Sequence, residues 1–255
     1  SRAGVRALSW SRDAPGPLAR RLDDIELLLP CLLGRDAADP TTFASASMRP
    51  VKASEAPKIV SLTGAGLERS AEVDEALKAA LAMTGLAVPA MEIKQVESYF
   101  SAWETILHCE ATAYHRRRLS TGFSAVTRAH LEAGLQLTAQ ELLEAQIMRT
   151  HFTELLLQSL GDWDALVLPT LPVVAPVAGE DWQSFGGRKV ATQDSMTWFC
   201  WIGNLAGLPC VTIPVPNPAS GLPVGMMLMG RPGKDEELLA IARFMDRRIN
   251  GKDPK

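Results

Sequence analysis

The stretch Asp164-Ala-Leu-Val-Leu-Pro-Thr-Leu-Pro172 sets four consecutive apolar residues in front of a proline. A short apolar run bounded by turn residues is typical of a strand buried inside an α/β sheet. We therefore expect a buried strand over residues 165–168 that ends at Pro169-Thr170. Because ligands of α/β sheets bind beyond the carboxyl ends of strands, Thr170 is a candidate binding residue.

The chain ahead of this stretch alternates between strand and helix patterns. Residues 58–62 form a short apolar run, and residues 86–93 form a second one. Between them lies an amphipathic segment that Ser70 can cap and Gly85 can end. Strand, helix and strand in this order predict the α/β class.

The chain behind the stretch continues the same pattern. Helical patterns cover residues 195–205 and 236–249. Two strands, over residues 210–215 and 224–229, are close enough in sequence to pair as a hairpin. The run Met226-Met-Leu-Met229 favours a strand buried on both faces.

The remaining segments are predicted to be helices joined by a polar surface connection over residues 35–57. Pro17 and Gly34 frame the first helix, and Thr138-x-x-Glu141 is a capping box that opens the last. These helices cover residues 18–33, 97–119 and 138–161.

Composition narrows the classes of protein to consider. The chain has 255 residues, 47% of them hydrophobic, and a net charge of -3. No basic surface recommends nucleic acid or an anionic membrane as a partner, and the apolar stretches are too short to span a bilayer. Four cysteines without a CxxC pair favour a reducing, cytoplasmic setting. The opening segment lacks the apolar core of a signal peptide, and Ser1 does not read as a native start.

The residues alone reveal no self-sufficient catalytic constellation. There is no G-x-S-x-G motif and no serine in a glycine-rich turn between strand and helix. Gly186-Gly187 is interpreted as a flexible turn, and Asp162 with Asp164 as a turn ahead of the strand. His108 and His115 are two helical turns apart, too far for two ligands of one zinc, so we expect no metal and no cofactor.

Ordered motifs then point to a known family. The segment 164–172 is similar to the D-x-L-x-x-P-T-x-P segment of amidase-signature enzymes, and Asn204-Leu-Ala-Gly-Leu-Pro209 and Gly221-Leu-Pro-Val-Gly225 follow in the family's order. The opening also resembles the family's pattern S-x-x-G … S-x-D-x-x-G-P-x-A-R, through Ser1 to Gly4 and Ser11 to Arg20. Each motif is weak alone, but the ordered set covers nearly the whole chain.

The resemblance implies a three-layer α/β/α fold around a mixed central sheet. Residues 1–255 would be the C-terminal part of a single amidase-signature domain. The family uses a Ser–cis-Ser–Lys triad and an acyl-enzyme, and every triad position lies ahead of the segment that matches Ser1 to Gly4. The chain is therefore expected to contain no catalytic residue and to need the N-terminal half of the enzyme, in the same or a separate chain. A homodimer stays open.

The resemblance also implies residues for the substrate pocket. In related enzymes the residues just ahead of N-x-x-G-x-P line the acyl pocket; by position these are Thr197, Cys200 and Trp201, and Thr170 joins them from the strand end. The alternative is that each is an ordinary core residue. The aromatic side chains around Trp201 would suit an apolar or aromatic acyl group. Two positions depart from the family: Cys200 replaces a Ser or Thr, and Met227 replaces a Gln.

Three functions follow from these observations. The first is hydrolysis of a small carboxamide to a carboxylate and ammonia or an amine, with the triad supplied from upstream. The second is a non-catalytic or degenerate subunit that serves binding or assembly. The third is the amidotransferase branch, which releases ammonia from glutamine. Cys200 is not favoured as a nucleophile because no histidine or acid can be argued beside it.

Overall fold

The computed structural model describes residues 1–44, 56–118 and 122–251. The chain divides into two compact units. The first unit comprises Ser1–Met48 and Ser98–Glu154, and the second comprises Arg49–Glu97 and Leu155–Lys255.

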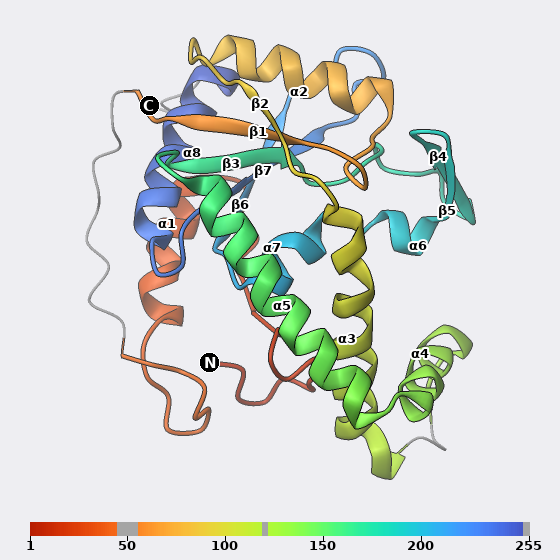
Figure 1. Ribbon diagram of the computed structural model, residues 1–255. Coiled ribbons are helices and arrows are strands. Elements are labelled where there is room, and N and C mark those ends of the chain that lie inside the picture. Colours follow the sequence, from red (N-terminus) through yellow and green to blue (C-terminus); the bar gives the residue numbers. More distant parts are fainter. Residues whose placement is uncertain (45–55, 119–121, 252–255) are drawn as a thin grey trace. The chain divides into compact units, whose positions relative to one another are not determined.

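The second unit is built on a five-stranded mixed sheet in the order β2-β1-β3-β7-β6 (Figure 1). Strand β1 runs parallel to β2 and β3, whereas β7 runs antiparallel to β3 and β6. The predicted hairpin of the last two strands is confirmed. The strands are β1 (Ile59–Thr63), β2 (Ala90–Glu92), β3 (Ala165–Pro169), β6 (Cys210–Val215) and β7 (Val224–Met229).

The core of this unit lies at β3 and β7. Every residue of β3 is buried, as are the four residues from Met226 to Met229. Helix α2 (Ala71–Met83) contacts β3, β6 and β7, and α8 (Asp235–Asn250) contacts α2, β6 and β7. The mixed sheet with flanking helices confirms the expected α/β architecture.

Helix α7 (Cys200–Ala206) lies directly against β6 and β7. At Gly203, a Cβ would approach Cys210 Sγ to 2.3 Å and Met229 Sδ to 3.7 Å. Cys210 and Met229 are register partners in the sheet. The helix can approach this closely only because residue 203 has no side chain.

A second, two-stranded sheet pairs β4 (Trp182–Phe185) with β5 (Arg188–Ala191). The sequence predicted the turn at Gly186-Gly187 but not the strands, because four-residue strands carry too little periodicity to recognise. Both glycines have positive φ, 56° and 76°, as a two-residue type I′ hairpin turn requires.

The first unit is helical among its described residues. It contains α1 (Leu22–Leu32), α3 (Phe100–His115), η2 (Arg116–Arg118) and α4 (Ala125–Gln136), and it shares α5 (Ala139–Leu160) with the second unit. The capping box of α5 is confirmed: Glu141 N donates to Thr138 Oγ1 over 3.2 Å, and Thr138 N donates to Glu141 Oε2 over 2.7 Å. Among the described residues, no helix combines the length and apolarity needed to cross a membrane.

Helix α4 was not predicted, and it packs tightly on α3. A Cβ at Gly134 would lie 2.3 Å from the His108 carbonyl oxygen, so the two backbones almost touch. The Thr112 hydroxyl donates to the Leu131 carbonyl over 2.7 Å. Ser124 caps α4 by accepting from Thr127 N over 3.2 Å, and that cap was the signal in the sequence.

Several predicted boundaries were wrong. Helix α1 begins at Leu22 rather than at residue 18, because Arg21 is still extended. Strand β2 covers only three residues of the range 86–93. The predicted helix over residues 97–119 is a 3₁₀ turn, η1 (Val96–Tyr99), followed by α3 and η2, and Leu119 lies outside the described residues. Part of the surface connection, residues 45–55, also lies outside them.

The predicted helix over residues 195–205 is divided into α6 (Thr192–Ser195) and α7. Between them Thr197 closes a turn, since its backbone N–H and its hydroxyl both donate to the Asp194 carbonyl at 3.1 Å. The division matters because it bends the chain at the predicted pocket residues.

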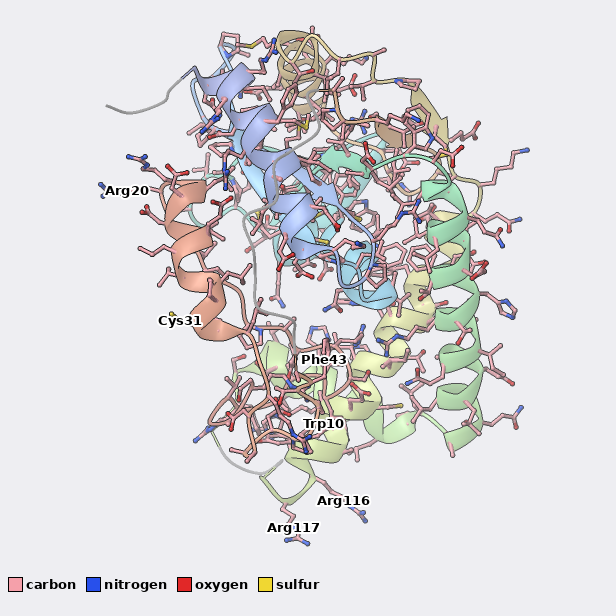
Figure 2. All side chains as sticks on the ribbon, turned by 90° about the vertical axis from the view of Figure 1, so that its left-hand side faces the viewer. Trp10, Arg20, Cys31, Phe43, Arg116 and Arg117 are labelled. Carbon is pink, nitrogen blue, oxygen red and sulfur yellow. The ribbon has the colours of Figure 1, made fainter. Side chains whose placement is uncertain are left out.

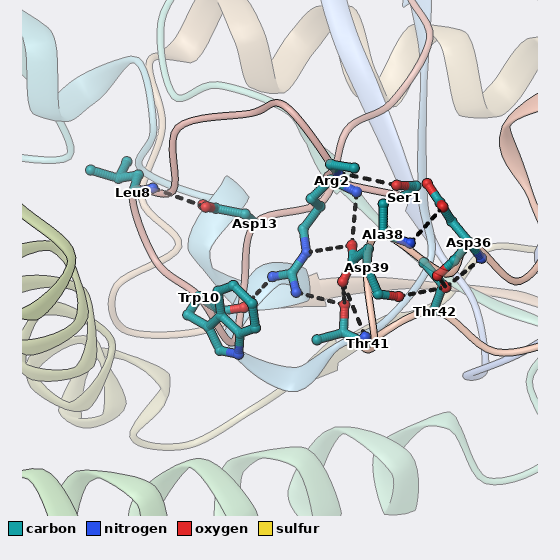
Figure 3. Close-up of polar contacts among 11 residues, drawn as sticks. Ser1, Arg2, Leu8, Trp10, Asp13, Asp36, Ala38, Asp39, Thr41 and Thr42 are labelled. Carbon is teal, nitrogen blue, oxygen red and sulfur yellow. Dashed lines mark hydrogen bonds and ion pairs between the residues drawn. The ribbon is translucent and has the colours of Figure 1, made fainter.

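Polar contacts order the start of the first unit (Figure 3). Arg2 binds Asp39 through its backbone N–H at 2.8 Å and through Nε at 3.3 Å, and its guanidinium also reaches Thr41 and the Trp10 carbonyl. In Figure 2 the side chains of Arg116 and Arg117 extend away from the end of α3. Both are exposed, as a solvated helix terminus would be.

Candidate functional site

The site begins where β3 ends, at Thr170. Its backbone N–H donates to the Gly225 carbonyl over 2.7 Å, and its Oγ1 lies 3.0 Å from Thr212 Oγ1, with either hydroxyl as donor. A Cβ at Gly225 would lie 2.7 Å from Thr170 Oγ1. The glycine therefore leaves room for a pair of threonine hydroxyls at the carboxyl end of β3.

Cys200 meets Thr170 from the start of α7. Its thiol donates to the Thr170 carbonyl over 3.8 Å, a normal length for a sulfur donor. Burial raises the pKa of the Cys200 thiol, which keeps it protonated and able to donate. A thiol held in this form is a poor nucleophile, so the residue suits a wall of a site rather than an attacking group.

The other two predicted pocket residues have different surroundings. Thr197 is exposed, and its hydroxyl is engaged in the turn after α6. Trp201 is 4% exposed and belongs to the buried core. A role for either in binding substrate stays a prediction. Thr170 and Cys200 are the pair that the structure brings into contact.

Sequence reasoning missed two members of this cluster, Thr212 and Gly225. Gly225 belongs to the G-L-P-V-G motif, so a signal for it existed. Thr212 carried none, because its position depends on the register of β6, which pairs Thr212 with Met227 and Pro214 with Gly225. Register is set by the hairpin loop and the buried pattern together, and the sequence did not specify it.

Asp164 has a structural role at the start of β3. Its carboxylate accepts from Lys58 N over 2.8 Å, and its own N–H donates to the Lys58 carbonyl over 2.8 Å. The aspartate of the motif thus aligns the beginnings of β1 and β3, in agreement with the interpretation as a turn.

A pair of histidines forms in the first unit. His108 Nε2 lies 3.0 Å from His130 Nδ1, which comes from α4. Burial, with His130 and Arg12 nearby, lowers the pKa of His108. In the described part of the chain, no three side chains of His, Cys, Asp or Glu gather as a metal site would need.

A small hollow of about 150 Å³ in the first unit is lined by residues of the Arg2 network, including Trp10, Asp13 and Asp39. The polar atoms of Arg2 are directed to Asp39, Thr41 and the Trp10 carbonyl, so they order the loops (Figure 3). The hydroxyl and thiol groups at the end of β3 remain the better candidate.

Comparison with known proteins supports the same assignment. Residues 1–239 match the family model described as Amidase. The chain is 32% identical to an amidase of Pseudomonas putida over 93% of its length, and 29% identical to a glutamyl-tRNA(Gln) amidotransferase subunit of Myxococcus xanthus over 97%. It covers 53% and 57% of these relatives, so it spans about half of their length.

The fold also has solved counterparts. With a TM-score of 0.88 and 23% identity, 96% of the chain superposes on 56% of a chain from a vestigial protein complex that reveals the evolutionary origins of an s-triazine catabolic enzyme. At this identity the likeness concerns the fold.

Proposed function

The chain belongs to the amidase family, and from this premise we propose that it forms the C-terminal portion of an amidase-signature enzyme. This enzyme hydrolyses a carboxamide to a carboxylate and ammonia or an amine. The proposal is supported by the matched residues 1–239 and by a length that is about half that of its relatives. The contact between Cys200 and Thr170 at the end of β3 carries the assignment of a pocket wall.

We propose the Ser–cis-Ser–Lys mechanism for the complete enzyme, with all three residues outside this chain. The lysine would act as the base, the middle serine would relay the proton, and the second serine would attack the amide carbonyl. Water would then hydrolyse the acyl-enzyme. This chain contributes the scaffold and one side of the pocket, and its partner is the N-terminal half of the same enzyme.

The chemistry of the wall favours a neutral acyl group. Thr170 and Thr212 offer hydroxyls, Cys200 offers a weak thiol donor, and none of the three is charged at neutral pH. Met227 stands opposite Thr212 in the sheet, and Trp201 follows Cys200 along α7, so apolar surface adjoins the polar groups. Such a mixture suits a small apolar or aromatic amide.

A cytoplasmic location accompanies this proposal. All four cysteines, Cys31, Cys109, Cys200 and Cys210, are free. Free thiols are typical of a reducing compartment.

A second candidate is release of ammonia from glutamine. It is supported by the likeness to the glutamyl-tRNA(Gln) amidotransferase subunit, at 29% identity for the Myxococcus xanthus protein. Glutamine differs from an aromatic amide by its charged α-amino and carboxylate groups, which require charged partners. The three side chains at the end of β3 supply none.

The test is ammonia release by the complete natural protein from aromatic amides, aliphatic amides and glutamine. We expect Thr170→Val to raise KM for the preferred amide about 3- to 10-fold, the effect of one lost hydrogen bond. Thr150→Val is the matched control, because that hydroxyl only donates to the Gln146 carbonyl on an exposed face of α5. Glutamine as sole substrate would favour the second candidate, and no hydrolysis of any amide would favour a non-catalytic subunit.

The need for the other half is tested by expressing residues 1–255 alone. An incomplete sheet with open strand edges should aggregate. A monomeric product that unfolds cooperatively would contradict the proposed partner.

A further inference from the structure

The hairpin of β4 and β5 touches the loop that follows β1. A Cβ at Gly186, at the tip of the hairpin, would lie 2.2 Å from Glu68 Cβ. The neighbouring Gly187 has nothing within 4 Å of the same position. The tip therefore rests on Glu68 through one glycine only.

Arg188, the first residue of β5, joins two carboxylates beside that contact. Its Nη2 binds Glu97 Oε2 at 2.7 Å, its Nη1 binds Glu97 Oε1, and its Nε lies 3.4 Å from Glu68 Oε2. A planar guanidinium is suited to such a paired arrangement, whereas lysine is not. Glu68 Oε2 also accepts from Gly66 N over 3.1 Å, so the arginine connects the hairpin to an ordered loop.

The loop that receives the hairpin is itself tightly packed. A Cβ at Gly64 would lie 2.5 Å from the Ile93 carbonyl oxygen, and a Cβ at Gly66 would lie 2.8 Å from Glu97 Cβ. Both contacts fix the loop against the segment that carries Glu97. Arg188 thus binds to a part of the second unit that has little room to move.

The other end of the hairpin reaches the predicted pocket segment. Phe185 is 4% exposed and packs edge-on against Trp198, with ring centroids 5.5 Å apart and an interplanar angle of 76°. Trp198 lies between Thr197 and Cys200 in the chain, in the bend between α6 and α7 (Figure 1). The position of Phe185 therefore bears on the residues that precede α7.

We propose that Arg188 is a positioning residue for the pocket wall: it clamps the β4–β5 hairpin to Glu68 and Glu97, and the hairpin holds the segment 197–201 in place through Phe185 and Trp198. The inference rests on the proposed function in one respect, the assumption that this segment faces substrate. Its mechanical part is independent of that function.

The first test measures amide hydrogen exchange of residues 196–206 in the complete natural protein. We expect Arg188→Met to speed exchange there about five-fold, the effect of losing a paired surface ion contact at the upper end of its usual worth. Lys189→Met is the matched control, because it removes one charge from the same strand but only a contact with the Trp182 ring at 5.2 Å. Equal exchange in the two variants would overturn the proposal.

A second pair of variants isolates the hairpin tip. Gly186→Ala and Gly187→Ala both place alanine at a positive φ, but only the first meets Glu68. Exchange in residues 196–206 should rise more for Gly186→Ala. An equal response would mean that the tip contact does not act on the pocket segment. Arg188→Lys, which keeps the charge and loses the paired geometry, should be intermediate, and it serves if Arg188→Met fails to fold.

Activity supplies the functional arm. In an active protein, Arg188→Met should raise KM for amides with large acyl groups about 3- to 10-fold while kcat changes less than two-fold, since no reacting group is touched. Faster exchange in a protein that hydrolyses no amide would sink the proposed function and leave the clamp standing. An unchanged KM with faster exchange would show that the clamp does not act on substrate and would overturn its positioning role.

Discussion

The two compact units rely on different interactions for their order. The second unit has an apolar centre, in which β3 is buried along its whole length and Leu166 and Leu168 are fully inaccessible. The first unit relies more on directed polar contacts. There the Ser9 hydroxyl donates to Glu110 Oε2 over 2.5 Å and accepts from Arg12 Nε at 2.9 Å.

The difference teaches where each unit is vulnerable. Apolar burial does not depend on direction or on pH, but it is sensitive to lost volume. A polar network depends on every partner being present, because a buried group left alone keeps its desolvation cost. Arg12 illustrates this cost: burial lowers the pKa of its guanidinium to about 10, although Glu110 acts in the opposite direction.

The largest effect is expected from a cavity in the sheet. Leu168→Ala should lower the free energy of unfolding of the second unit by about 2–5 kcal/mol, because the side chain is fully buried. Denaturant unfolding followed by hydrogen exchange measures it. Leu18→Ala, at a fully exposed leucine, should stay within about 0.5 kcal/mol of the parent. A loss below about 1 kcal/mol in the Leu168 variant would contradict the picture of a close-packed core.

A smaller effect is expected in the first unit. Ser9→Ala removes both the donor to Glu110 and the acceptor for Arg12, which should cost about 1–3 kcal/mol. The control is Ser101→Ala, whose exposed hydroxyl only donates to the Ser98 carbonyl. Indistinguishable unfolding curves for these two variants would remove the polar network from the account of this unit.

Helix caps should cost the same in both units. Ser70 caps α2 in the second unit and Ser124 caps α4 in the first, each by accepting from the backbone N–H three residues on. Each serine-to-alanine change should cost about 1 kcal/mol, because capping is a local interaction. Hydrogen exchange at the first turns of the two helices measures it. A much larger cost at Ser124 would show that the first unit depends on α4 as a whole.

The smallest effect at neutral pH concerns Asp39. Hydrogen bonds from the Thr41 hydroxyl and from the backbone N–H of Arg2 hold its pKa well below the ordinary value. Since the folded pKa is the lower one, the stability it contributes is complete above the unfolded pKa of about 3.9 and fades as the pH falls toward the folded pKa.

Thermal unfolding of the parent and of Asp39→Asn between pH 7 and pH 2.5 tests this dependence. The difference between the two proteins should be constant down to about pH 4.5 and should narrow below it. Asp23→Asn, at an exposed pair with Arg21, is the control. A difference that narrows already between pH 7 and pH 5 would contradict the lowered pKa.

Much of the second unit could be predicted because its signals are local. A continuous apolar run predicts β3 wherever it occurs, and Ser70 caps α2 through an atom three residues away. The reciprocal contacts of Thr138 and Glu141 are equally local. By contrast, the strands of the β4–β5 hairpin were missed, since two four-residue segments contain less than one full pattern each.

The candidate site was only partly predictable for the same reason. Thr170 follows from the strand that precedes it, and Cys200 was found through its distance from the Asn204 motif. Their contact across 3.8 Å, and the presence of Thr212 beside them, depend on strand register and on the approach of α7 to the sheet. Neither distance is encoded in any short stretch.

By itself, the sequence determined the α/β class, the buried strand and the family, because apolar periodicity, caps and ordered motifs act over a few residues. The tertiary structure alone decided that Thr170, Cys200 and Thr212 meet at the end of β3, and that Arg188 ties a distant hairpin to Glu68 and Glu97. Those contacts join residues far apart in the chain, and only the close packing of glycines such as Gly186, Gly203 and Gly225 brings their backbones near enough to form them.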